Sequence, residues 1–146
     1  MPPFRFRLQN VLNYRVQLED QAKMVFAGAR EKHERQHHEV ERLDEELKQT
    51  LNRRHEALKA NRDEVWLLEN YCKGLAADLE QAQALLRHLA FEMEEARQKL
   101  VQAMQNRSLL DKLKERQYER HLKEENLQEQ RFNDEIITLR PRPAPF

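Results

Sequence analysis

Glycine is scarce in this chain of 146 residues, and its five prolines lie only at the two ends. The two glycines, Gly28 and Gly74, are too few for the many turns of a compact globular domain. Residues 4–140 contain no proline, so nothing in them removes a backbone donor and breaks a helix. The sequence therefore predicts long helices whose core is a narrow seam, too thin to enclose a substrate pocket.

Cysteine, aromatic residues, net charge and long apolar runs are also limited. The single cysteine, Cys72, cannot form a disulfide within the chain, so we expect a packing role in a reducing compartment. The 26 basic and 26 acidic side chains give a formal net charge of zero, which argues against general binding to nucleic-acid phosphates. Because no signal peptide or run of 18 apolar residues is present, we expect a cytosolic or peripheral protein.

An unbroken heptad pattern lies in the middle of the chain. Alternate steps of four and three residues meet an apolar side chain every time, at Leu68, Cys72, Leu75, Leu79, Ala82, Leu86, Leu89, Met93, Ala96, Leu100 and Ala103. This spacing averages 3.5 residues per turn, which keeps one stripe facing a partner helix in a left-handed supercoil. We therefore predict an all-α fold built on a long coiled coil.

A weaker stripe precedes this seam and predicts its partner helix. It passes through Leu8, Val11, Arg15, Leu18, Ala22, Val25, Ala29, His33, Gln36, Val40, Leu43, Leu47, Leu51, Arg54 and Leu58. Two consecutive steps of four residues meet at Ala29, which predicts a stutter that locally relaxes the supercoil. We expect helix one to span about residues 5–59.

A turn is predicted at about residues 60–63, followed by helix two over about residues 64–139. Asn61 and Glu64 have the spacing of a capping box, and Asp63 is the competing cap. The two helices would then form a long antiparallel hairpin, which is monomeric. Because neither glycine nor proline marks the turn, a continuous helix in a parallel dimer is the alternative.

The hairpin predicts a register in which the numbers of opposing residues add to about 123. Leu47 would face Leu75, and the small residues 27–29 would face Ala96. Side chains as small as these would let the helices approach closely, which offers a reason for Gly28 within a helix.

In the same register helix two overhangs helix one from about Tyr118 to Leu139. A sparser apolar stripe continues there through Tyr118, Leu122, Phe132, Ile136 and Leu139. An apolar stripe on an unpaired helix predicts a protein-binding surface. The proline-rich tail of residues 140–146 is expected to be disordered, and the whole chain to be one hairpin domain.

Residues 33–37 match H-E-x-x-H, the pattern in which two histidines bind zinc and the glutamate acts as a base. The surroundings oppose catalysis, because the segment has no apolar shelter, no strand to align a peptide and no evident third ligand. We therefore interpret residues 33–37 as part of a polar, solvated helix. We predict no catalytic residue, no cofactor and no metal site. Incidental binding of a transition metal by His33, His37 or His38 is the alternative.

Two further groups of residues are candidates for partner binding. Trp66 and Tyr71 follow the predicted turn, where Trp66 is either an exposed anchor for a partner or a cover over the hairpin tip. Arg5, Arg7 and Arg15 make the N-terminus basic. These arginines would meet an acidic surface, although a solvated helix end is the simpler interpretation.

Three segments together resemble the bacterial flagellar FliJ family. They are FRFRLQNVLNYR at residues 4–15 followed by Glu19, LLDKLKERQY at residues 109–118, and NDEI at residues 133–136. The resemblance extends over nearly the whole chain through its length and hairpin organisation. The two terminal blocks carry most of it, because a coiled-coil middle is shared by many unrelated proteins.

The resemblance implies a cytoplasmic component of the flagellar type III export apparatus, peripheral at the inner face of the cell membrane. It implies a non-enzymatic stalk that enters the hexameric export ATPase, promotes assembly of the ring, and connects it with the membrane export gate and with export chaperones. Residues that contact the gate carry over only as a region. A homodimeric coiled-coil scaffold and a helical metalloprotease are the competing hypotheses.

Overall fold

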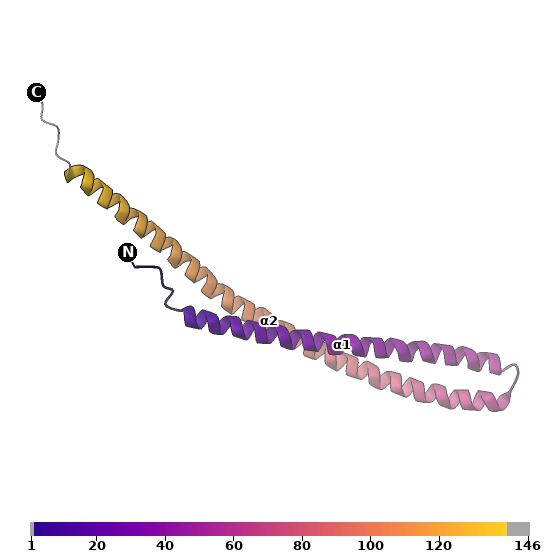
Figure 1. Cartoon of the computed structure of the whole chain (residues 1–146). Helices are drawn as coiled ribbons and strands as arrows, with labels where there is room; N and C mark the ends of the chain where they lie inside the picture. The colour runs from indigo at the N-terminus through magenta and orange to yellow at the C-terminus, as the bar shows by residue number, and fades with distance from the viewer. Residues whose placement is uncertain (1, 140–146) are drawn as a thin grey trace, which may run out of the picture. The chain divides into compact units, whose positions relative to one another are not determined.

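A computed structural model describes residues 2–139, which form two α-helices joined by a short turn. Helix α1 spans Gln9–Ala57 and has 49 residues, and helix α2 spans Arg62–Leu139 and has 78 (Figure 1). The part of the chain that the structure describes contains no strand, so the predicted all-α helical hairpin is confirmed. The tail of residues 140–146 lies outside the described residues.

Helix α1 is shorter than predicted at both ends. It begins at Gln9 instead of about residue 5, and residues 2–8 before it are not helical. The backbone N–H of Gln9 donates to the carbonyl of Phe6 over 3.1 Å, which forms the turn into the helix. At the other end the N–H groups of Lys59 and Ala60 donate to carbonyls three residues earlier, which tightens the last turn and ends α1 at Ala57.

Asn61 caps the N-terminus of α2. Its Oδ1 accepts a hydrogen bond of 3.1 Å from the backbone N–H of Asp63, so Asp63, the competing cap, is the donor of this bond. Asp63 and Glu64 lie in the first turn, where their negative charge complements the helix dipole. Local chemistry therefore starts α2 at Arg62 without a glycine or proline.

The chain packs as two units, which are described separately. One consists of Asp20–Gln102 and contains the turn; the other consists of the residues up to Glu19 together with those from Ala103 onward. We call them the turn unit and the terminal unit. The sequence predicts a single hairpin domain over the whole chain, and this stays a prediction.

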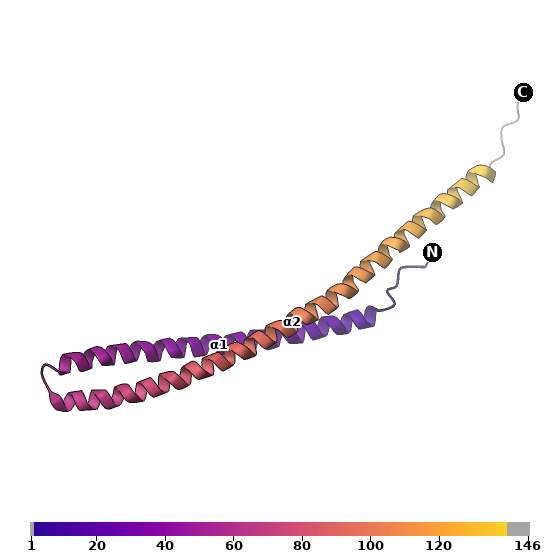
Figure 2. The same cartoon turned by 180° about the vertical axis from the view of Figure 1, so that it is seen from behind.

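The turn unit is an antiparallel pair held by a small apolar core. Leu43, Leu75 and Ala82 are buried together, and Val40, Leu47 and Leu79 pack against them. Figures 1 and 2, which view the molecule from the front and from behind, both show the end of α1 and the start of α2 running side by side from the turn. Their hydrogen bonds join Gln36 to Ala82 and Glu46 to Tyr71, pairs whose numbers add to 118 and 117. The predicted sum of about 123 is therefore too large near the turn, because the turn itself lies at residues 58–61.

The predicted seam of α2 is confirmed, since all eleven of its residues from Leu68 to Ala103 are buried or half-buried. The predicted phase of α1 needs correction. Strict steps of three and four connect its inward positions without a stutter: Leu12, Arg15, Glu19, Ala22, Phe26, Ala29, His33, Gln36, Val40, Leu43, Leu47, Thr50, Arg54 and Ala57. Phe26 points inward, whereas Val25 is 61% exposed. Choosing Val11, Leu18 and Val25 over their inward neighbours Leu12, Glu19 and Phe26 produced the stutter.

Gly28 does not mark a close approach of the helices. A Cβ added at this position would meet nothing within 4 Å. Instead, an open groove of about 480 Å³ lies here, lined in part by Val25, Gly28, Ala29 and Ala96. The packing reason predicted for this glycine is therefore wrong.

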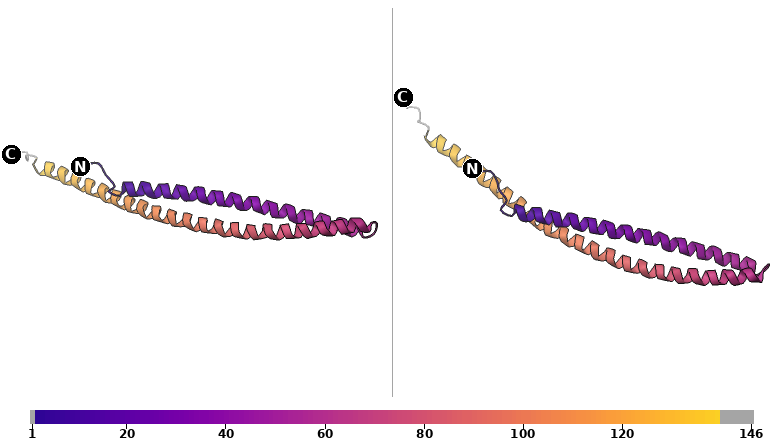
Figure 3. Two further views of the ribbon diagram at one scale, coloured as in Figure 1. Left: turned by 90° about the horizontal axis from the view of Figure 1, so that it is seen from below. Right: turned by 60° about the horizontal axis from the view of Figure 1, so that its bottom comes forward.

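The terminal unit is built from the extended N-terminal segment, the start of α1 and the last part of α2. Phe6 and Leu12 are buried in it, whereas Leu8 and Val11, predicted to face inward, are exposed. Leu8 precedes the helix, so a helical phase counted from it fails. Figure 3 shows the N-terminal segment running past the start of α1 beside α2.

Candidate partner-binding surfaces

The N-terminal segment alternates aromatic and basic residues, and its backbone is not helical. Successive side chains of an extended chain point to opposite sides, so Phe4 and Phe6 turn inward while Arg5 and Arg7 are exposed. The ring of Phe4 meets that of Tyr118 edge-on, with centroids 5.3 Å apart, and lies 5.6 Å from the ring of His121. These aromatic contacts attach the segment to α2.

A basic groove results from this attachment. It has a volume of about 560 Å³ and is lined by residues of the N-terminal segment, the start of α1 and Lys114 of α2. Arg5, Arg7 and Lys114 all contribute cations to it. Arg15, predicted with the other arginines, is half-buried on the inward face of α1 and is less available to a partner.

A buried ion pair fixes α1 against α2 in the same unit. Glu19, only 4% exposed, accepts a hydrogen bond from the guanidinium of Arg107, which also donates to Asp111. The bonds to Glu19 and then to Asp111 raise the pKa of Arg107, so this side chain stays charged. We did not predict this pair, although Arg107 is the next stop on the heptad seam after Ala103.

Beyond His121 the apolar stripe of α2 has no covering partner within the described residues. Every residue of 126–139 is exposed, and Phe132 is 63% exposed. Tyr118 contacts Phe4 edge-on but is still 46% exposed, more than Leu122 at 39%, so Phe4 covers only part of its ring. We call the exposed stripe of Leu122, Phe132, Ile136 and Leu139 the uncovered face. Leu127 and Ile137 are exposed as well, but the helical period places them on other sides of α2.

The turn presents a second exposed apolar surface. Trp66 is 65% exposed, and Leu58 and Leu67 beside the turn are exposed as well, so Trp66 does not act as a buried cover. The hydroxyl of Tyr71 donates to Glu46 of α1, and this bond raises the pKa of the phenol. A partner at this end would therefore meet the ring of Tyr71, because its hydroxyl is already bound.

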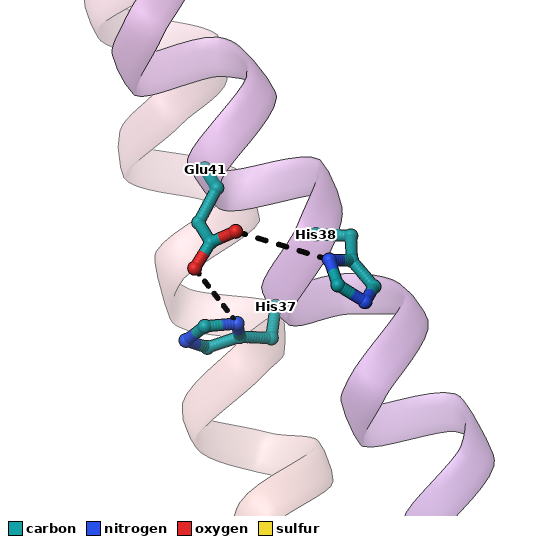
Figure 4. Close-up of side chains that lie close together, drawn as sticks. All are labelled: His37, His38 and Glu41. Atoms are coloured by element: carbon teal, nitrogen blue, oxygen red, sulfur yellow. Dashed lines mark ion pairs between the residues drawn. The ribbon is translucent and has the colours of Figure 1, made fainter.

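The H-E-x-x-H segment separates its two histidines by environment. His33 is half-buried on the inward face of α1, whereas His37 is exposed. The metal-ligating side chains that lie close to His37 are those of His38 and Glu41 (Figure 4), and His33 of the motif is not in this group.

The family model described as Flagellar FliJ protein matches residues 4–143. The chain belongs to the flagellar FliJ protein family. Membership in the FliJ family makes it a component of the flagellar export apparatus. The matched residues include the N-terminal segment from Phe4 onward and the whole uncovered face. No curated protein and no solved structure matches the chain. Among the described residues, no helix combines the length and apolarity needed to cross a membrane.

Proposed function

We propose that this chain is the non-enzymatic stalk of the hexameric flagellar export ATPase. In this role it enters the ring, promotes ring assembly, and links the ATPase to the membrane export gate and to export chaperones, at the inner face of the cell membrane. Family membership supports a place in the export apparatus. The observation that carries the finer proposal is the uncovered apolar face of α2 in the same unit as an exposed basic segment.

The terminal unit is the proposed ATPase-binding surface. Arg5 and Arg7 supply positive charge, and Leu122 and Phe132 supply apolar area that water otherwise covers. Interfaces derive most of their binding free energy from a few such anchors, especially aromatic and arginine side chains. The proposed contacts are Arg5, Arg7, Arg15, Tyr118, Leu122 and Phe132.

The turn is the proposed surface for the export gate. Trp66 and the ring of Tyr71 are exposed there, in a region where residues 31–69 contain eleven Asp or Glu and eight Lys or Arg. This acidic balance differs from the basic N-terminal segment, so the two surfaces suit different partners. Export chaperones are a third proposed partner class, to which we assign no surface.

Two sets of substitutions test this division. The triple variant Arg5→Ala, Arg7→Ala, Leu122→Ala should weaken binding and stimulation of the export ATPase at least about tenfold, because it removes charge and an apolar anchor together. It should leave binding to the cytoplasmic part of the gate unchanged. Trp66→Ala with Tyr71→Ala should have the opposite pattern.

Phe91→Ala is the matched control, because Phe91 is an exposed aromatic residue of α2 outside both proposed surfaces. It should change neither readout, and circular dichroism should show native helix content in every variant. The division is wrong if the two sets exchange their effects or weaken both partners equally. A chain that binds neither protein but binds its own copy would support the scaffold hypothesis instead.

A further inference from the structure

Three metal-ligating side chains lie together on the exposed surface of α1. The ligand atoms of His37, His38 and Glu41 are all within 4.8 Å of one another. Nδ1 of His37 is 3.3 Å from Oε1 of Glu41, and Nδ1 of His38 is 3.8 Å from its Oε2. In Figure 4 the two imidazoles approach the carboxylate from different sides.

The helix itself brings these residues together. Glu41 is four residues after His37 and three after His38, and residues at both spacings are neighbours on a helix surface. The carboxylate therefore lies between two consecutive histidines that would otherwise diverge. Because all three side chains are exposed, they can adjust their rotamers without disturbing the core.

The donor set matches that of a known class of zinc sites. Two imidazoles and one carboxylate, completed by water, hold zinc in tetrahedral His₂Glu centres. Ligand atoms 2.0–2.2 Å from a tetrahedral ion lie about 3.4 Å from one another. His37 approaches one oxygen of Glu41 to 3.3 Å and His38 approaches the other to 3.8 Å, so these exposed side chains must rotate to bring both imidazoles and one oxygen around an ion.

We propose that His37, His38 and Glu41 form a surface site for a divalent transition metal such as Zn²⁺, with water as the remaining ligand. Exposure to solvent makes the affinity modest, in the micromolar range, because exposed side chains are less firmly held in position than buried metal ligands. The site differs from the H-E-x-x-H interpretation, which pairs His37 with His33. None of its three residues is among those proposed to contact the ATPase or the gate.

The chain provides matched controls for this site. His88 and Glu92 form an exposed pair at the same four-residue spacing, with 3.0 Å between Nε2 of His88 and Oε1 of Glu92. Within the described residues, however, His37, His38 and Glu41 are the one group of three ligands that lies close enough to hold an ion. A single histidine and a carboxylate give fewer ligands, so they should bind zinc more weakly.

Isothermal titration of the full chain with ZnCl₂, in a buffer that does not chelate metals, tests the proposal. The wild-type chain should bind one ion with saturation. His37→Ala, His38→Ala and Glu41→Gln should each weaken binding at least about tenfold, since second-shell changes alone have effects of that size. His33→Ala and His88→Ala should leave the titration unchanged.

Three results would overturn the site. The first is the absence of saturable binding up to about 1 mM zinc, which corresponds to an affinity too weak to be specific. The second is an equal loss in His33→Ala and His37→Ala without any effect of His38→Ala, which would assign the ion to the H-E-x-x-H pair. The third is an equal loss in His88→Ala, which would show unspecific surface binding. Circular dichroism of each variant separates these results from unfolding.

Discussion

Polar side chains on the inward face of α1 have specific partners. Glu19 pairs with Arg107, Nε2 of Gln36 donates to the carbonyl of Ala82 over 2.9 Å, and the hydroxyl of Thr50 donates to the carbonyl of Glu46 over 2.8 Å. No described buried side-chain nitrogen or oxygen lacks a partner. A buried polar side chain finds its hydrogen-bond partner on the other helix only when the two helices are paired in one register. The bonds of Glu19 and Gln36 to α2 therefore favour the observed register.

Arg107→Met should destabilise the terminal unit. It removes the charge-assisted hydrogen bond to the buried carboxylate of Glu19, so we expect a measurable loss in the free energy of unfolding. The loss should be moderate because Arg107 is itself partly exposed. Urea unfolding followed by circular dichroism measures the change.

Arg97→Met is the control, because the ion pair of Arg97 with Glu94 is exposed on one helix surface. Such pairs contribute little to stability, so the unfolding midpoint of this variant should stay close to that of the wild-type chain. Equal losses in the two variants would mean that the Glu19–Arg107 pair has no special role in stability.

At the scale of the helices, the sequence predicts α2 better than α1 for a physical reason. Each inward stop of α2 from Leu68 to Ala103 is apolar, so only one phase fits. Several inward stops of α1 are polar and often have an apolar neighbour, as with Phe26 beside Val25. Burial of Glu19 or Thr50 depends on a tertiary partner, and no periodicity of a single helix encodes that partner.

The candidate surfaces were predictable only in part for the same reason. Exposure of Phe132 and Leu139 follows from the length of α2 beyond its partner, which the register predicts. The inward turn of Phe4 depends on a non-helical segment that packs back on Tyr118, and no helical periodicity predicts that contact. The grouping of His38 with His37 and Glu41 follows from spacings of three and four residues on one helix, which the H-E-x-x-H motif does not include.

Leu75→Asp should disrupt the core of the turn unit. Leu75 is 5% exposed and is buried with Leu43 and Ala82, so the change removes apolar contacts and places a carboxylate in a dry seam. We expect a loss of roughly 2–5 kcal/mol, measured by thermal or urea unfolding. Leu85→Asp, at a position of α2 that is 47% exposed, should cost much less. Similar losses at both positions would contradict the assignment of the seam.

At the scale of the whole molecule, the inward faces of α1 and α2 find partners within one chain, in each unit separately. A second copy is therefore not needed to cover the seam, which favours the hairpin over the parallel dimer. Part of the apolar area that remains exposed lies on the uncovered face and beside the turn. Exposed apolar surface of this kind is typical of protein-binding sites, so the molecule is best understood through its partners.

The most direct test of the proposed stalk is photo-crosslinking from position 122. A photoreactive phenylalanine analogue replaces Leu122 in one sample and Trp66 in another, and each is irradiated with the export ATPase and the cytoplasmic part of the gate together. The proposal predicts that position 122 crosslinks to the ATPase and position 66 to the gate. Crosslinks from position 122 only to the gate, or only to a second copy of this chain, would contradict it.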